Sequence, residues 1–94
     1  MRLPIAWTDE AKETFDYTVL QIEAQWGDAI ASRFVKETHR IIDSISLQPY
    51  LFKSSIHENV RQAFISKQTS MFYEVHGAHI TILYFWDNRQ EPII

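Results

Sequence analysis

The chain has 94 residues, of which 46% are hydrophobic and 22% charged, and this size and mix predict a single domain over residues 1–94. Two glycines and three prolines exclude a collagenous or low-complexity chain, and the lack of cysteine excludes disulfides and thiolate chemistry. The formal charge of −3 gives no overall positive field for nucleic acid, so any anion site must be a local cluster. No apolar run suits a signal peptide or a membrane span, so we expect a soluble cytoplasmic protein.

The chain opens with a short apolar segment, residues 3–7, that predicts a first strand. Thr8 then offers a hydroxyl N-cap, and the two acidic residues after it favour the positive end of a helix. Residues spaced by three and four predict one face of a helix over residues 9–25. They are Ala11, Phe15, Thr18, Val19, Ile22 and Trp26.

A second helix is predicted from Asp28 to about Leu47. Gly27 suits a left-handed C-cap of the first helix, and Asp28 suits the N-cap of the second. Pro49 disfavours helix at the residue before it, which ends the second helix. A connection of one or two residues predicts an antiparallel helical hairpin.

The second half of the sequence changes to alternating apolar residues and predicts three strands after a loop at 49–59. The strands are expected at 60–66, 69–76 and 79–86. Gly77 suits a type II′ turn between the last two strands, and the apolar run 80–86 predicts a central strand covered on both faces. The order is β-α-α-β-β-β, an α+β fold with a mainly antiparallel sheet under a helical hairpin.

Three residues of this half form a candidate anion site. Arg61, Tyr73 and Arg89 can meet near one end or face of a meander, and two guanidiniums beside a phenol suit a phosphate. The alternative is that the arginines pair with nearby carboxylates and hold loops. His57 can serve as a general base or be an ordinary loop residue.

Other residues carry weaker signals. His76 and His79 flank a hairpin tip without further ligands, so we expect no metal site. The consecutive apolar residues Tyr50, Leu51 and Phe52 cannot all face the core, and an exposed patch there predicts a partner site. The three tryptophans, which lie at the ends of elements, are expected to anchor the core.

The pieces of the sequence, taken in order, resemble the RelE/ParE toxin superfamily of bacterial toxin–antitoxin systems over nearly the whole chain. The first half contributes Ile5-Ala6-Trp7, Ala11, Phe15, Trp26-Gly27, Ala31, Phe34, Leu47 and Pro49. The second half contributes the Arg61 strand, Phe72-Tyr73-Glu74-Val75, Ile80, Ile82-Leu83 and Asp87-Asn88-Arg89-Gln90.

The resemblance implies one of two activities. RelE-like members cleave messenger RNA on the ribosome, and this activity would assign catalytic roles to Arg61, Arg89, Tyr73 and His57. ParE-like members poison DNA gyrase without that catalytic set. Lys53 is the one Lys or Arg in the loop before Arg61, and residues 90–94 carry no Tyr or His, so we favour the ParE-like branch. A degenerate, non-toxic binding module is a third alternative.

The resemblance also implies partners. A cognate antitoxin with a disordered C-terminal segment is expected to wrap the chain at Tyr50, Leu51 and Phe52 or along the helical hairpin, with a heterotetramer as one possible assembly. The target, DNA gyrase or alternatively the ribosome and mRNA, is expected to contact Lys53, Arg61, Lys67 and Arg89. No cofactor and no membrane is expected.

Overall fold

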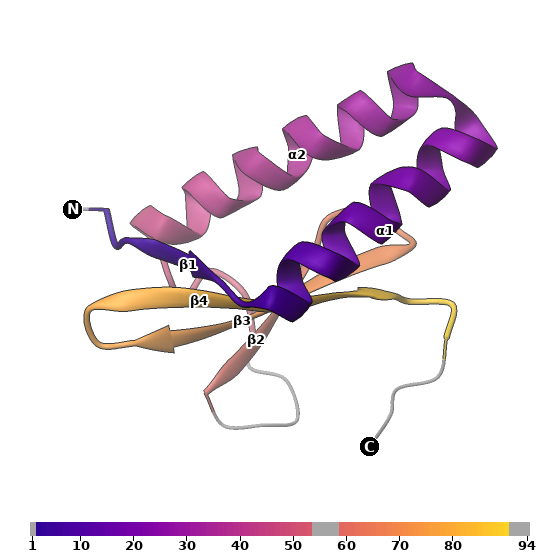
Figure 1. The fold of residues 1–94 in the computed structure, drawn as a ribbon. Helices are drawn as coiled ribbons and strands as arrows, with labels where there is room; N and C mark the ends of the chain where they lie inside the picture. Colours follow the sequence, from indigo (N-terminus) through magenta and orange to yellow (C-terminus); the bar gives the residue numbers. More distant parts are fainter. Residues whose placement is uncertain (1, 54–58, 91–94) are drawn as a thin grey trace.

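The computed structural model describes residues 2–53 and 59–90. Its elements are β1 (Ile5–Trp7), α1 (Asp9–Trp26), α2 (Asp28–Leu47), β2 (Val60–Phe64), β3 (Thr69–His76) and β4 (His79–Asp87). The two helices form an antiparallel hairpin over one face of the sheet (Figure 1). The predicted α+β class and element order are therefore confirmed, and only β1 and β2 are shorter than expected.

The four strands lie in the order β1-β4-β3-β2. Strand β1 is parallel to β4, and the other two pairings are antiparallel. The predicted central position of the apolar last strand is confirmed, but its predicted burial on both faces is wrong. The helices cover only the face that carries Ile80, Ile82 and Phe85. On the other face aromatic rings shield one another instead, as where Tyr84 stacks on Phe72 with ring centroids 4.9 Å apart.

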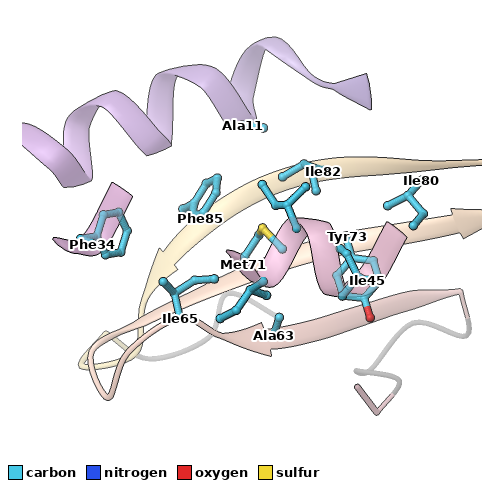
Figure 2. Packing of buried hydrophobic residues seen from close by; sticks show 12 residues of the cluster. Ala11, Phe34, Ile45, Ala63, Ile65, Met71, Tyr73, Ile80, Ile82 and Phe85 are labelled. Carbon is cyan, nitrogen blue, oxygen red and sulfur yellow. The ribbon is translucent and has the colours of Figure 1, made fainter. Parts of the chain in front are cut away.

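The core lies between α2, α1 and the inner face of the sheet. Side chains from all three converge there, as Figure 2 shows. Helix α2 contributes the most buried side chains, because its apolar stripe continues through Ile41 and Ile45 to its C-terminal end. Helix α1 buries only Ala11 completely and packs Phe15 against Trp7 and Phe85.

Two threonine hydroxyls join α1 to the backbone of β4. Strand β1 pairs with β4 only as far as Ile82, so the edge of β4 beyond it has no strand partner. Thr8 caps α1 by accepting from the N–H of Ala11, and its hydroxyl donates to the carbonyl of Leu83 at 2.7 Å. The Phe85 N–H donates to the Thr14 hydroxyl at 2.9 Å. Helix α1 thus satisfies backbone groups that β1 leaves free.

The hairpin tip differs from expectation in two details. Gly27 has φ 91° and ψ 173°, a conformation that is accessible to glycine and strained for other residues, so the positive φ is confirmed. Asp28 lies in the first turn of α2 and makes no cap hydrogen bond, so its predicted capping role is wrong. Trp26 is 61% exposed and does not anchor the core. None of the helices in the described ranges is long and apolar enough to span a bilayer.

The turn between β3 and β4 also corrects a prediction. Neither Gly77 nor Ala78 has a positive φ, so the turn is not type II′. Pairing continues to the last residues of the hairpin, where the His76 and His79 rings stack with centroids 4.5 Å apart. This cross-strand contact closes the hairpin without a conformation that only glycine adopts.

Replacing Thr14 with Val tests the link between α1 and β4. The methyl keeps the shape of the side chain but leaves the Phe85 N–H without its acceptor, so we expect a loss of about 1–3 kcal/mol in unfolding free energy. Thr18→Val is the matched control, because the Thr18 hydroxyl only donates to Thr14 within the helix. Urea denaturation measures both, and an equal loss in the two variants would contradict a special role for Thr14.

Candidate functional site

The Arg61 side chain is engaged by the segment that follows α2. Its Nη1 donates to the carbonyl of Phe52 at 2.6 Å, and its guanidinium carbon lies 4.6 Å from the centroid of the Tyr50 ring. A guanidinium over an aromatic face gains electrostatic attraction, and the hydrogen bond fixes its position. The alternative prediction, that Arg61 holds a loop, is confirmed. Among the residues that the structure describes, its partner is the carbonyl of Phe52 and no carboxylate.

Tyr73 is fully buried and pairs across the sheet with Arg61. Its hydroxyl donates to the carbonyl of Pro49 at 3.0 Å. Burial raises the pKa of the Tyr73 phenol above 10.0, and the nearby Arg61 charge offsets this only in part. The phenol therefore keeps its proton at neutral pH and uses it to hold Pro49, which does not suit a general base.

Arg89 forms an ion pair with Asp87 within the turn that follows β4. Its Nε and Nη2 donate to the two carboxylate oxygens of Asp87 at 3.0 and 2.8 Å. These bonds lower the pKa of the Asp87 carboxyl below 3.8. The alternative prediction, that the arginines pair with nearby carboxylates and hold loops, is confirmed for Arg89.

The expected meeting of Arg61, Tyr73 and Arg89 does not occur. Arg61 lies opposite Tyr73, whereas Arg89 follows Asp87, which pairs with Thr69 at the start of β3. Tyr73 and Thr69 are four positions apart, about 13 Å along an extended strand. The prediction that the three residues meet near one end or face of the sheet was wrong. The alternation of apolar residues does not reveal the register of β3 against β4, which sets their separation.

The remaining predicted contact residues fall into two groups. Tyr50 and Leu51 are 66% and 51% exposed, while Phe52 packs partly against the core, so the expected exposed patch is present in two of its three residues. Lys53 and Lys67 are exposed at different places, since Lys53 lies beside the edge of β2 and Lys67 lies in the β2–β3 turn. His57 lies outside the described residues.

The β2–β3 turn and the turn after β4 are held together by a chain of polar contacts. The buried Ser70 hydroxyl accepts from Gln62 Nε2 at 2.8 Å and donates to Asn88 Oδ1 at 2.7 Å. Asn88 in turn donates through its backbone N–H to the Gln68 carbonyl at 2.7 Å and through Nδ2 to the Lys67 carbonyl at 3.3 Å. Two predicted cations, Lys67 and Arg89, therefore lie on neighbouring turns at the same end of the sheet.

Sequence reasoning expected a partner surface along the helical hairpin but did not name the residues that form it. Trp26 and Ile30 are exposed there and line a hollow with Lys67 and Gln68. The signal that could have revealed them is the single-residue connection at Gly27, which places the last turn of α1 beside the first turn of α2. Across residues 2–53 and 59–90, no three His, Asp or Glu side chains are placed to hold a metal ion.

Several solved structures with the same fold come from toxin–antitoxin systems. A chain of the chromosomal ParDE system of P. aeruginosa matches with a TM-score of 0.77 and 18% identity over 92% of this chain and 96% of that chain. The YoeB dimer of Staphylococcus aureus matches with a TM-score of 0.67 and 19% identity over 92% and 97%. The RelBE2 complex of Mycobacterium tuberculosis matches with a TM-score of 0.62 and 13% identity over 94% and 100%.

Comparison by sequence gives a different result. No protein-family model and no curated protein sequence matches this chain. The likeness therefore lies in the order and packing of the elements, and this chain has the fold of the RelE/ParE-type toxins.

Replacing Tyr73 with Phe tests the bond to Pro49 and the raised pKa. At pH 7 we expect a loss of about 1–2 kcal/mol in unfolding free energy, because the Pro49 carbonyl loses its donor. Above pH 10 the unfolded phenol ionises before the folded one, so the unchanged chain loses stability as pH rises, and the variant lacks this component. Urea denaturation across this pH range measures both effects. If the unfolding free energy fell equally steeply with pH above 10 in both proteins, the raised pKa of Tyr73 would be contradicted.

Replacing Arg61 with Ala is expected to loosen the segment from Pro49 to Lys53. The variant loses the bond to Phe52 and the contact with Tyr50, at a cost of about 1–3 kcal/mol. Hydrogen exchange at the Leu51 N–H, which donates to Gln48 at 3.0 Å, should accelerate. Arg89→Ala is the control, because an exposed ion pair contributes little and its loss should leave the unfolding free energy nearly unchanged. Equal effects in the two variants would show that Arg61 does not fasten this segment.

Proposed function

We propose that the chain is the toxin of a type II toxin–antitoxin system and acts in the ParE-like manner, as a poison of DNA gyrase that a cognate antitoxin neutralises. The observation that carries this proposal is the likeness of the fold to solved toxins over more than nine-tenths of the chain. The complexes named for two of these neighbours, ParDE and RelBE2, support an antitoxin as the partner.

The geometry of the arginines favours gyrase poisoning over mRNA cleavage. A ribonuclease of this kind needs cations and a proton-transfer group gathered around one phosphodiester. Here Arg61 and Tyr73 are both bonded to backbone carbonyls, and Arg89 is paired with Asp87 at the far end of β3. Of the groups that the resemblance would make catalytic, Arg61 and Tyr73 are therefore engaged by the fold, and Arg89 lies apart from them.

The target-binding role is assigned to exposed cations rather than to Arg61. Lys67 and Arg89 lie on neighbouring turns that Asn88 ties together, so they present two cations from one end of the sheet. Lys53 adds a third exposed cation elsewhere on the surface. Tyr50 and Leu51 remain the exposed apolar patch on which a partner would bury surface.

Expression of the chain in a bacterial host is the test of this function. We expect growth arrest with loss of negative supercoiling and intact mRNA, and the purified chain should inhibit supercoiling by gyrase. The double variant Lys67→Ala with Arg89→Ala should weaken that inhibition about tenfold, equivalent to ~1.4 kcal/mol. Lys36→Ala, an exposed cation on α2, is the matched control and should inhibit as the unchanged chain does.

Two results would contradict the proposal in different ways. Rapid cleavage of ribosome-bound mRNA with normal supercoiling would assign the RelE-like activity instead. Normal growth on accumulation of folded protein would assign a non-toxic binding module.

A further inference from the structure

A hollow of about 490 Å³ lies beside the tip of the helical hairpin. Its walls come from the end of α1, the first half of α2 and the β2–β3 turn. We call it the tip hollow, and Trp26, Ile30 and Lys67 are among the residues that line it. A volume in this range suits a small organic ligand, whereas a bare inorganic ion would fill only a fraction of it.

The inner wall of the tip hollow is apolar. Phe34 of α2 and Ile65 of the β2–β3 turn are buried there, and Figure 2 shows them together at that end of the core. Trp26 and Ile30 also line the hollow and remain 61% and 37% exposed. A ligand with an apolar body that covers these side chains removes apolar surface from water, which favours its binding.

The charged side chains of the tip hollow are positive on balance. Arg33 on α2 and Lys67 on the β2–β3 turn line it, and neither forms an ion pair within the described part of the chain. Glu37 also lines it, but Arg40 donates to both of its carboxylate oxygens, at 2.9 and 2.6 Å. An anionic group beside Arg33 and Lys67 therefore gains an attraction that a cationic group lacks.

The backbone that carries each of the two cations is fixed before a ligand arrives. Arg33 lies within α2, a helix of 20 residues. Lys67 lies in a turn in which the Ser66 hydroxyl accepts from the N–H of Thr69 at 3.2 Å. Asn88 also donates through Nδ2 to the Lys67 carbonyl at 3.3 Å. A site that is largely formed in advance loses little conformational entropy on binding, so a small ligand can bind it.

We propose that the tip hollow binds a small organic anion with an apolar body, such as a medium-chain carboxylate. The hydrocarbon lies against Phe34 and Ile65, and the carboxylate is attracted by Arg33 and Lys67. Inorganic phosphate lacks the apolar contact, and a neutral hydrocarbon lacks the charge, so neither matches both parts of the hollow. This ligand site is independent of the proposed target, because neither gyrase nor a partner chain takes part in it.

The test titrates the full-length chain with octanoate below its micelle concentration, and with octylammonium, which has the same hydrocarbon length and the opposite charge. The NMR signals of the Trp26 indole and the Gln68 amide report the site, and their shifts against ligand concentration give the dissociation constant. We expect saturable shifts of both signals and affinity for octanoate about fivefold or more above that for octylammonium. Arg33→Gln should weaken octanoate binding by about fivefold or more. Lys36→Gln, the same loss of charge on an exposed residue of α2 outside the hollow, should change it less than about twofold.

Any other result would exclude a small-anion site in the tip hollow. Absence of saturable octanoate binding would leave the hollow to a larger partner, and signal shifts confined to other surfaces would place the ligand elsewhere. Equal affinity for octylammonium, or equal loss in the two variants, would show that Arg33 does not attract the ligand. The proposed function is judged separately, because Arg33 is not among the residues assigned to the target. Arg33→Gln should therefore still arrest growth, and failure of the unchanged chain to arrest growth would contradict the toxin function whatever octanoate does.

Discussion

The attachment of α1 to the unpaired edge of β4 determines the rest of this structure. Strand β1 pairs with β4 for only three residues, and the hydroxyls of Thr8 and Thr14 bind the carbonyl of Leu83 and the N–H of Phe85 beyond it. This fixes both the position and the direction of α1, because two points along its length are bound to one strand. The connection at Gly27 is a single residue, so α2 must return across the same face. The outer face of the sheet and the tip of the hairpin are left uncovered as a result.

The chemistry that this fold supports depends on what Arg61 and Tyr73 bind, because each can bond to the backbone or be left free for a ligand. Arg61 and Tyr73 lie opposite each other on β2 and β3, and both reach toward the segment that follows α2. That segment offers two backbone carbonyls as hydrogen-bond acceptors. The Arg61 guanidinium donates to the carbonyl of Phe52, and the Tyr73 phenol donates to the carbonyl of Pro49. A cation held in this way stabilises a loop and is withdrawn from an incoming phosphate. Loss of the segment's contacts, rather than a change of fold, would restore the cation to solvent.

The distribution of charge explains how an acidic protein offers a basic hollow. Helix α1 carries five acidic residues and one lysine, so its own charge is more negative than the −3 of the whole chain. On the other side of the hairpin, Arg33 of α2 faces the β2–β3 turn, and that turn carries Lys67. Screening at physiological salt confines each field to about 8 Å, so the acidic helix and the basic hollow act as separate surfaces. A small anion can approach the hollow although the whole chain repels it.

The sequence by itself determined the class, the element order and most of the boundaries. Periods of three to four residues and of two residues distinguish helix from strand locally, and Gly27 and Pro49 end helices through their own backbone limits. It also offered the alternative that the arginines pair with nearby carboxylates, which Arg89 does with Asp87 in its own turn. Only the tertiary structure decided that Arg61 meets the carbonyl of Phe52, that Arg89 lies far from Tyr73, and that Trp26 lines a hollow. These depend on strand register and on how far the hairpin extends beyond the sheet, which are set by contacts between residues distant in sequence.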